Sequence, residues 1–420
     1  MEYLPVELIG NILSRLKAAR DVVVASATCK KWREACRTHI HTLHFHYCDW
    51  SRYRELSTSK LESIITQTVL QTTNLQNLSV IIDPDEADEF SAASVITWLI
   101  YTRKSLRELY YDVRTNPNIN IIKGCSDKLE ILALAHNHIS GVDLSYQNFP
   151  HLVSLCLSDV RISALDLNLL LTACPKIETF NLMRPVIATS DSLTVLELKS
   201  FSLKHIYVQG ICFDKFILEA DSLEKLSLSN CTLVIFELIG QGSLRVLKMA
   251  NVSIFHLEFG ENTLNLEVVN VSNFTSTWLQ FYRIISKSSK LTRLRLWNVE
   301  LDDEDDFVDL DTMFVCFPQL RCLSINYSLP DDVCYYGLHG SYQFNNVVML
   351  ELGWTVINDM FTDWAAGLLA RCPNLRKLVI YGAVSEAETP YELRTLADIT
   401  SSMVRLMRKY VNVDVEFEYE

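Results

Sequence analysis

One short phrase recurs along most of the chain and constrains its fold more than any other feature. The phrase is apolar-x-x-apolar-x-apolar, as in LEILAL from Leu129 and LTRLRL from Leu291. Successive copies lie about 25 residues apart, and a repeat at such a period indicates a stacked array of similar units. The thirteen copies begin at Leu75, Leu106, Leu129, Leu152, Ile177, Leu193, Leu223, Leu244, Leu266, Leu291, Leu320, Val347 and Leu375.

Several copies continue with a polar residue at position eight and apolar residues at positions nine and eleven. Examples are Asn230-Cys231-x-Leu233 and Asn251-Val252-x-Ile254. We expect positions four and six to face inward from a short strand, and the polar residue to turn the chain and bond freed backbone groups. One unit cannot bury its own apolar face, so the units stack as parallel strands. The sequence therefore predicts an α/β solenoid with a period in the leucine-rich-repeat (LRR) range.

The connectors between the phrases differ in kind. Residues 94–104, 165–174, 277–288 and 359–372 have apolar residues at helical spacing, which predicts outer helices. Between 193 and 271 the returns are short and strand-like, so we expect strands or irregular turns there. At the end, 391–409 predicts a helix, and the alternating VNVDVEFEYE predicts a half-buried strand that caps the array.

Charge argues against nonspecific nucleic-acid binding. The chain has 38 Lys and Arg against 51 Asp and Glu, a formal net charge of −13. Much of the acid is confined to residues 83–89, 302–311 and 411–420, and the remainder is close to neutral. A phosphate-tracking protein would need a basic stripe, which this pattern does not supply.

Cysteine usage and the N-terminus predict a cytoplasmic or nuclear protein. The 12 cysteines are scattered without a CxxC pair, which favours reduced thiols. The opening MEYLPVELIG does not resemble a secretory signal, and no apolar run approaches the ~18 residues of a membrane helix.

Residues 1–45 do not fit the repeat and have a helical pattern. After Leu4 and Pro5, apolar residues share one helical face, and Pro5 is suited to open that helix. Asp21 can cap a second helix, and CKKWREACR can form a third around Trp32. Three short helices make a very small core, so the module would gain stability by docking on a partner or on the repeats.

These residues resemble the F-box, a helical module that recruits a Skp-type adaptor of cullin ubiquitin ligases. The resemblance rests on LPVELIGNILSRL, Asp21 and TCKKWR at the spacing of that family. With the repeats, the chain resembles a plant-type F-box/LRR-repeat protein, a non-catalytic substrate-recognition subunit of a Skp–cullin–F-box ligase. The resemblance implies adaptor-binding residues in the module, namely Leu4, Pro5, Leu8, Ile9, Ile12, Leu13, Leu16 and Trp32.

The predicted organisation is an F-box at 1–45, a linking or capping segment at 46–74, LRRs at 75–390 and a C-terminal capping helix and strand at 391–420. The module has seven basic residues against four acids. The family's adaptor is acidic, so this charge favours docking.

No motif predicts catalysis, a metal or a cofactor. His39, His41, His44 and His46 lie between Cys36 and Cys48 and invite a zinc hypothesis. However, Leu43 and Phe45 alternate with two of them, which a strand with histidines on its wet face explains more simply. The acidic run at 302–311 lacks the spaced ligands of an EF-hand.

The exposed positions of the repeats suggest where a target binds. Positions three, five and seven face outward, and toward the C-terminus they carry the residue types that anchor interfaces. We predict a target-protein surface there, rimmed by 302–311, at Arg293, Arg295, Trp297, Asn326, Glu351, Lys377 and Tyr381.

Two alternatives remain open. The predicted surface residues can simply pack on one another. The chain can also be an LRR scaffold, or a co-receptor for a small ligand such as a hormone or inositol phosphate, that delivers nothing to a ligase. Basic outward positions such as Lys199, Lys225 and Lys248 would serve such a ligand, although single exposed lysines are ordinary.

Overall fold

The computed structural model describes residues 4–53, 55–82, 89–125, 127–144, 148–188, 194–261, 263–276, 278–301, 308–326, 336–337, 342–355, 359–382 and 390–419. The chain forms two compact units, residues 1–211 and 212–420. No helix within the described part of the chain combines the length and apolarity that crossing a membrane requires.

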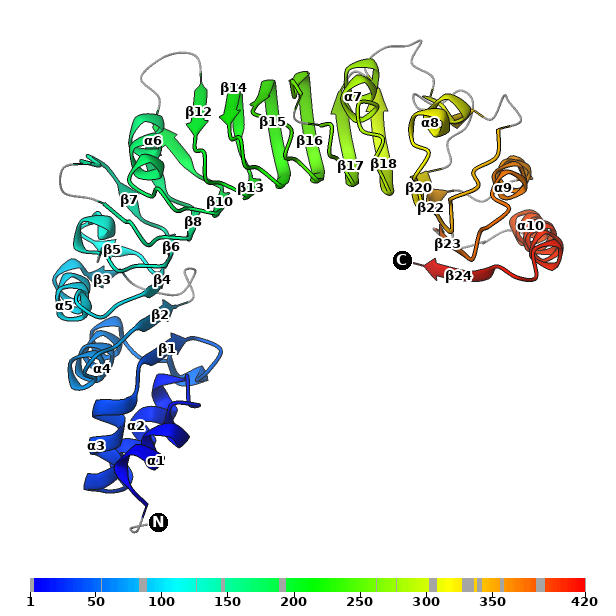
Figure 1. The fold of residues 1–420 in the computed structure, drawn as a ribbon. Helices are drawn as coiled ribbons and strands as arrows, with labels where there is room; N and C mark the ends of the chain where they lie inside the picture. The colour runs from blue at the N-terminus through cyan, green and yellow to red at the C-terminus, as the bar shows by residue number, and fades with distance from the viewer. Residues whose placement is uncertain are drawn as a thin grey trace. The chain divides into compact units, whose positions relative to one another are not determined.

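Unit 1 begins with the three predicted helices, which the structure confirms: α1 (Val6–Leu13), α2 (Ala19–Thr28) and α3 (Lys30–His39). Helix α3 packs against both others (Figure 1). Pro5 directly precedes α1 as predicted, but Asp21 lies in the first turn of α2 and does not cap it. The helix starts earlier because Ala18 is held beside β1 (Thr42–His46), where the His44 backbone N–H donates to the Lys17 carbonyl at 2.9 Å.

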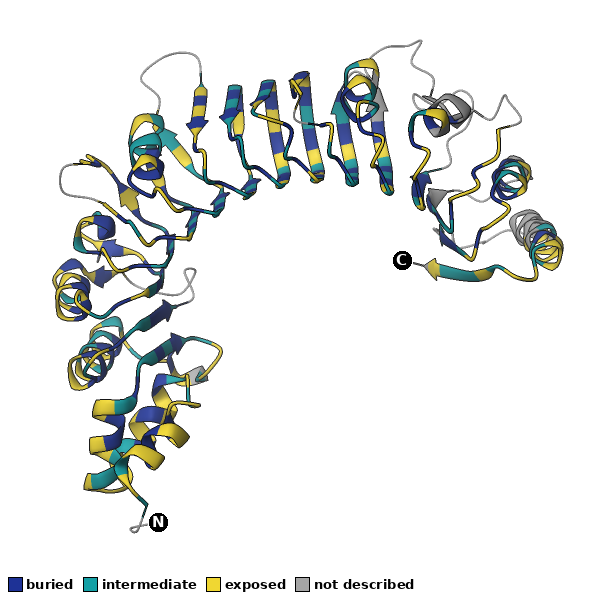
Figure 2. Cartoon of the chain, in the orientation of Figure 1, coloured by how far each residue is buried: buried dark blue, intermediate teal, exposed yellow. Residues whose placement is uncertain are grey.

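The inner strands of unit 1 pair in parallel, all in one register. Their order is β1, β2 (Asn77–Ile81), β4 (Glu108–Asp112), β6 (Ile131–Ala135), β8 (Ser154–Ser158), β10 (Thr179–Met183) and β13 (His205–Gln209). In β8, Leu155 and Leu157 at positions four and six are fully buried, as predicted. Buried residues recur along the inner strands of this unit (Figure 2). The sheet starts at Thr42, so β1 belongs to it although its residues lie at the end of the predicted module.

One predicted inner strand is wrong. The phrase from Leu193 contains β12 (Val195–Lys199), but β10 pairs with β13, Phe180 opposite Ile206. The segment LKHIYV from Leu203 has the same apolar spacing and takes the inner position. Lys199 is therefore not an inner-strand residue, which removes it from the basic positions considered for a ligand.

Helices and small strands complete the repeats of unit 1. Helices α5 (Ala92–Thr102) and α6 (Ala164–Thr172) confirm two predicted connectors, whereas α4 (Thr58–Gln71) was not predicted. A three-stranded parallel sheet follows the inner strands: β7 (His138–Ile139), β9 (Arg161–Ser163) and β11 (Val186–Ala188). Two short strands also pair, β3 (Phe90–Ser91) with β5 (Thr115–Asn116), and single 3-10 turns cover Ser51–Tyr53 and Ile121–Gly124.

Unit 2 starts with long strands, which confirms the strand-like returns. Strands β15 (Lys225–Ile239), β16 (Val246–Glu258) and β17 (Val268–Ser276) pair in parallel, and β14 (Cys212–Glu219) pairs with the second half of β15. The inner sheet continues through β18 (Arg293–Leu301), β20 (Cys322–Asn326), β22 (Met349–Thr355), β23 (Lys377–Gly382) and β24 (Asp414–Tyr419).

Helices return in the second half of this unit (Figure 1). They are α7 (Trp278–Ile285), α8 (Leu310–Cys316), α9 (Asp359–Arg371) and α10 (Pro390–Lys409). The predicted helices at 277–288, 359–372 and 391–409 are confirmed, and so is the final strand. Strands β19 (Val308–Asp309) and β21 (Tyr336–Gly337) form a short pair.

The polar residues at position eight sit in left-handed turns. Asn230, Asn251, Asn273 and Asn298 have φ between 47° and 54°. Their side chains also bond one another from repeat to repeat: Asn251 Nδ2 donates to Asn230 Oδ1 at 2.9 Å, Asn273 to Asn251 at 2.6 Å and Asn298 to Asn273 at 2.9 Å. Asn326 then donates to Asn298. This asparagine ladder, which the spacing did not predict, fixes the corner of five successive repeats.

Candidate functional site

The first candidate surface lies on the N-terminal module, where the predicted residues divide by burial. Ile9 and Leu13 are fully buried and hold α1 in the module's own core. Leu8 and Ile12, one helical turn apart, are 49% and 50% exposed. Pro5 is exposed, and Leu4, Leu16 and Trp32 are half-buried. A partner can therefore reach Leu8 and Ile12 directly, while Ile9 and Leu13 act through the packing of the helix.

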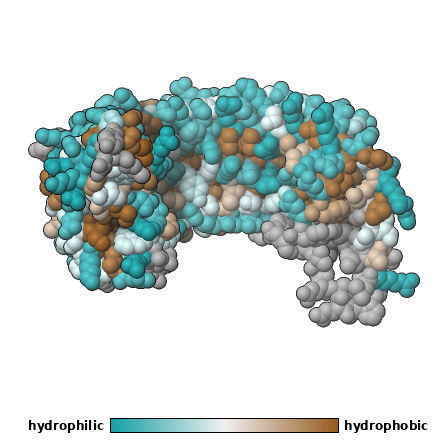
Figure 3. Space-filling view, turned by 90° about the horizontal axis from the view of Figure 1, so that it is seen from below, coloured by the Kyte–Doolittle hydropathy of each residue, from teal (hydrophilic) through white to brown (hydrophobic). Residues whose placement is uncertain are grey.

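Gly10 explains how close the helices of this module approach. A Cβ at Gly10 would lie 2.5 Å from the Cβ of His39 on α3, so only glycine allows α1 to pack there. Helix α2 adds two further exposed apolar side chains, Val23 and Val24. Figure 3, which looks onto the end of the module, shows apolar side chains gathered among polar ones.

The second candidate surface lies on the inner strands of unit 2 and is built around Arg295. Arg295, Ser324 and Glu351 lie in register on β18, β20 and β22. The Arg295 guanidinium donates from Nη2 to Glu351 Oε2 at 2.7 Å and from Nε to Ser324 Oγ at 3.3 Å. The two charged side chains are only 29% and 17% exposed, so this ion pair is less screened than a surface pair.

The next outward row holds an aromatic pair that spans several strands. The Arg295 guanidinium carbon lies 4.0 Å from the ring centroid of Trp297, a cation–π contact. Trp297 on β18 meets Tyr381 on β23 edge to face, with ring centroids 5.0 Å apart. Burial, and then the nearby Glu351 and Glu418, raise the pKa of the Tyr381 hydroxyl, which keeps it neutral.

Gly353 makes this aromatic contact possible. It lies on β22 between the two rings, opposite Asn326 on β20. A Cβ there would lie 2.6 Å from Asn326 Oδ1 and 3.0 Å from Trp297 Cε2. Gly353 stands at position seven of its phrase, which faces outward, but the phrase does not predict this role. The available signal is a glycine at a position where other repeats carry large side chains.

Two buried polar atoms border the same space. Trp297 Nε1 and Asn326 Oδ1 have no hydrogen-bond partner in the structure described. An unpaired buried donor or acceptor costs about 1–3 kcal/mol, so the surface tolerates a local penalty at this point. We define the inner-strand cluster as Arg295, Trp297, Asn326, Glu351, Gly353 and Tyr381.

The remaining predicted residues lie around the cluster. Arg293 is exposed on β18 and has no ion-pair partner within the described ranges. The Lys377 ammonium pairs with Glu416 Oε2 on β24 at 2.8 Å, and that hydrogen bond raises the pKa of the lysine. Most of the proposed acidic rim, 302–307, lies outside the described residues. Four predicted residues are thus linked by contacts with one another: Arg295, Trp297, Glu351 and Tyr381. The alternative that the predicted residues simply pack on one another requires the same contacts.

The histidines of the zinc hypothesis do not converge on one point. Leu43 and Phe45 are buried in β1, which confirms the predicted strand, and the rings of His44 and His46 stack 5.1 Å apart. His41 Nδ1 lies 3.0 Å from the Asn74 carbonyl oxygen. Among the described residues, a group that could hold a metal ion is His46, Cys48 and Asp49, whose ligand atoms lie within 4.8 Å of one another. This trio is largely exposed and omits most of the predicted ligands.

Comparison with known proteins assigns both parts of the chain. A family model described as F-box-like matches residues 1–48, and a model described as the LRR repeats of FBD-associated F-box protein At5g56370 matches residues 102–280. The Arabidopsis thaliana F-box/LRR-repeat protein At1g67190 is 56% identical over 421 residues, covering 100% of both chains. This chain belongs to the F-box/LRR-repeat proteins. A second Arabidopsis thaliana relative, F-box protein At1g10780, is 22% identical over 371 residues, with 85% and 83% of the chains covered.

Among solved structures, a chain of the TLR13–ssRNA13 complex resembles this F-box/LRR-repeat protein at 14% identity and a TM-score of 0.24. The match covers 76% of this chain and 65% of that chain, and it carries no argument about function. F-box/LRR proteins are in general non-catalytic substrate adaptors of Skp–cullin–F-box ligases. The two family models and the relative that is 56% identical confirm the resemblance inferred from residues 1–45 and from the repeats.

Proposed function

We propose that this chain recruits a target protein to a Skp–cullin–F-box ubiquitin ligase, in the cytoplasm or nucleus, without a catalytic residue of its own. The module binds a Skp-type adaptor, and the inner strands of unit 2 bind the target. Holding both raises the local concentration of target lysines near the ubiquitin-carrying enzyme.

The exposed pair on α1 carries this proposal. Leu8 and Ile12 are half exposed on a helix whose opposite side is fully buried. Completing the burial of two such side chains contributes about 1 kcal/mol each, because full burial of a leucine or isoleucine is worth about 1.5–3 kcal/mol. The basic excess of the module adds steering toward an acidic adaptor.

Binding to a purified Skp-type adaptor tests the module. Wild-type protein should form a one-to-one complex, and Leu8→Asp or Ile12→Asp should abolish it by burying a charge without a partner. Ile100→Asp is the matched control, because Ile100 is an apolar residue of α5 that is 66% exposed and lies outside the module. Failure of the wild-type chain to bind, or equal loss with Ile100→Asp, would refute the assignment.

The target surface is tested at Arg293. This exposed arginine is not committed to the inner-strand cluster, so Arg293→Glu changes the surface without breaking the contacts of Arg295. Lys225→Glu is the control, because Lys225 is also exposed on an inner strand but lies three strands away on β15. Target capture should be lost with Arg293→Glu, and kept with Lys225→Glu and with Leu8→Asp.

Target lifetime separates the ligase from the scaffold. In cells that carry Leu8→Asp, a target of the ligase should persist longer than in cells with the wild-type chain. A partner whose lifetime does not change would instead support the LRR scaffold or co-receptor alternative.

A further inference from the structure

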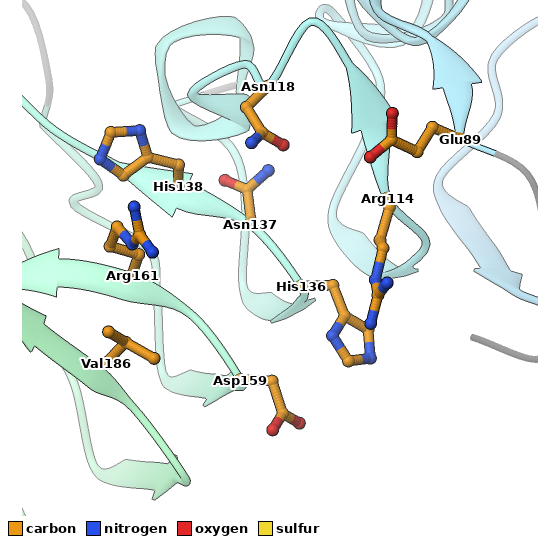
Figure 4. Close-up of a pocket in the computed structure, with 9 residues that line it drawn as sticks. All are labelled: Glu89, Arg114, Asn118, His136, Asn137, His138, Asp159, Arg161 and Val186. Carbon is orange, nitrogen blue, oxygen red and sulfur yellow. The ribbon is translucent and has the colours of Figure 1, made fainter. Parts of the chain in front are cut away.

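A polar cavity lies in unit 1 and shares no residue with either surface described above. It has a volume of about 320 Å³ and lies where the chain leaves the inner strands β4, β6 and β8. Figure 4 shows Arg161, His138 and Asn137 on one side and Arg114 with His136 on the other. His138 and Arg161 are in register on β7 and β9, so consecutive repeats present basic side chains to the same space.

The two arginines of this cavity lack the partners that others in the unit have. Arg107 pairs with Glu130 at 2.5 Å, and Arg184 donates to both carboxylate oxygens of Asp159. Within the described ranges, neither Arg114 nor Arg161 has a carboxylate within ion-pair distance. Among the residues that the structure describes, two guanidinium groups therefore line the cavity without a carboxylate partner.

The acids that line the cavity do not cancel this charge. Asp159 is already neutralised by Arg184, and these hydrogen bonds lower the pKa of its carboxyl. Glu89 contributes one carboxylate near Arg114. His136 lies 3.6 Å from Asp112 Oδ1, which leaves its other ring nitrogen for a ligand.

Asn137 adds a hydrogen-bond acceptor to the wall. It is only 4% exposed, and its Nδ2 donates to the Ile119 carbonyl at 3.0 Å, which orients the amide. Its Oδ1 is buried with no hydrogen-bond partner in the structure described. A ligand that carries an N–H or O–H beside an anionic group would satisfy this oxygen.

We propose that this cavity binds a phosphate monoester. Arg114 and Arg161 contact the phosphate oxygens, since guanidinium groups match phosphate in charge and geometry. His136 and His138 donate to it, and Asn137 accepts from the group attached to the ester oxygen. A carboxylate has too few oxygens to engage four basic side chains, and the cavity is at the lower end of the size range of small-ligand sites. The ester can be a phosphorylated side chain of a protein or a free small phosphate.

Calorimetric titration of the full chain with O-phosphoserine tests the site, with serine as the matched ligand that lacks the phosphate. Wild-type protein should bind phosphoserine and not serine, and Arg114→Gln or Arg161→Gln should weaken binding at least tenfold. Arg283→Gln, which replaces an exposed arginine of α7, should bind as the wild type does. Circular dichroism of each variant checks the fold, and either cavity variant suffices if the other does not fold.

Two further ligands distinguish the sources of the phosphate. If a phosphoserine within a short peptide binds tenfold more tightly than free phosphoserine, the ester belongs to a polypeptide. If glycerol 3-phosphate binds as tightly as the peptide, it is a small phosphate. No binding of any phosphate, or affinity unchanged in Arg114→Gln and Arg161→Gln, would overturn the proposal.

Discussion

The contact between Trp297 and Tyr381 depends on the missing side chain of Gly353, which predicts that the stability cost of Gly353→Ala depends on the presence of Trp297. Gly353 is not among the glycines with positive φ, so alanine fits its backbone. On that account alone the substitution stabilises the protein by about 0.4–1 kcal/mol, through the unfolded chain. The added Cβ, however, would meet Trp297 and Asn326 at 3.0 and 2.6 Å.

Steric crowding should outweigh that gain in the wild-type background. Overpacking of this kind costs about 1–3 kcal/mol. Shifting the Trp297 ring also weakens an aromatic pair worth about 0.5–1.5 kcal/mol. We therefore expect Gly353→Ala to destabilise the region by about 1–2 kcal/mol. In a Trp297→Ala background the contact with the ring is gone and the contact with Asn326 Oδ1 remains, so the same substitution should cost about 1 kcal/mol less than in the wild-type chain.

Hydrogen exchange of the β22 and β23 amides measures this local stability. It is preferable to a global melt because a repeat array need not unfold as one unit. Protection should fall with Gly353→Ala in the wild-type chain and fall clearly less in the Trp297→Ala chain. An equal loss in both backgrounds would refute the reasoning, because Trp297 would then not be what fills the space over Gly353.

Three further predictions concern other parts of the chain. Asn273→Gly removes two ladder hydrogen bonds and should lower the free energy of unfolding in urea by about 1 kcal/mol. Asn273→Ala also forces alanine into a left-handed turn and should lower it by about 2–3 kcal/mol. Equal losses of stability in the two variants would contradict the turn argument. Iodoacetamide at about pH 8 should alkylate the exposed Cys48 well before Cys125, because burial raises the pKa of Cys125 to about 12. Peptide mass spectrometry follows the order of alkylation, and the opposite order would contradict this prediction. Burial, followed by the charges of neighbouring groups, lowers the pKa of His44 below 6.5. The unfolded chain then takes up the proton more readily, so the stability around β1 is full above about pH 6.5 and falls as the pH drops below it; exchange rates of β1 amides, compared with His44→Gln, should show this loss only in the wild type.

Much of the fold was predictable because the apolar positions of each repeat indicate which of its residues are buried. Positions four and six of the phrase are apolar in almost every copy, and the structure buries them. The exception shows the limit of this reasoning. LTVLEL from Leu193 and LKHIYV from Leu203 fit the phrase equally well, and only pairing with β10 decides between them. Pairing depends on distant strands, which a local pattern does not report.

The sites were predictable only in part. The outward positions of β18 to β23 identified Arg295, Trp297 and Tyr381, because the pleat of a strand fixes which residues are exposed. The contact between Arg295 and Glu351, 56 residues later, depends on register across two strands and on the small Ser324 between them. The cavity in unit 1 was missed because its basic residues follow the turn, beyond the part of the phrase that repeats.

The asparagine ladder links the turns of unit 2 to the inner-strand cluster. Asn298 occupies the last left-handed turn of the ladder, and it accepts a hydrogen bond from Asn326 Nδ2. Because that bond holds the amide, Asn326 Oδ1 is directed toward Gly353 and the edge of Trp297. The position of the Trp297 ring is thus limited by Asn326 and by Arg295, which Glu351 and Ser324 hold in turn. Side chains already fixed in this way lose little conformational entropy when a partner binds. The inner-strand cluster is therefore suited to a partner that binds without rearranging it.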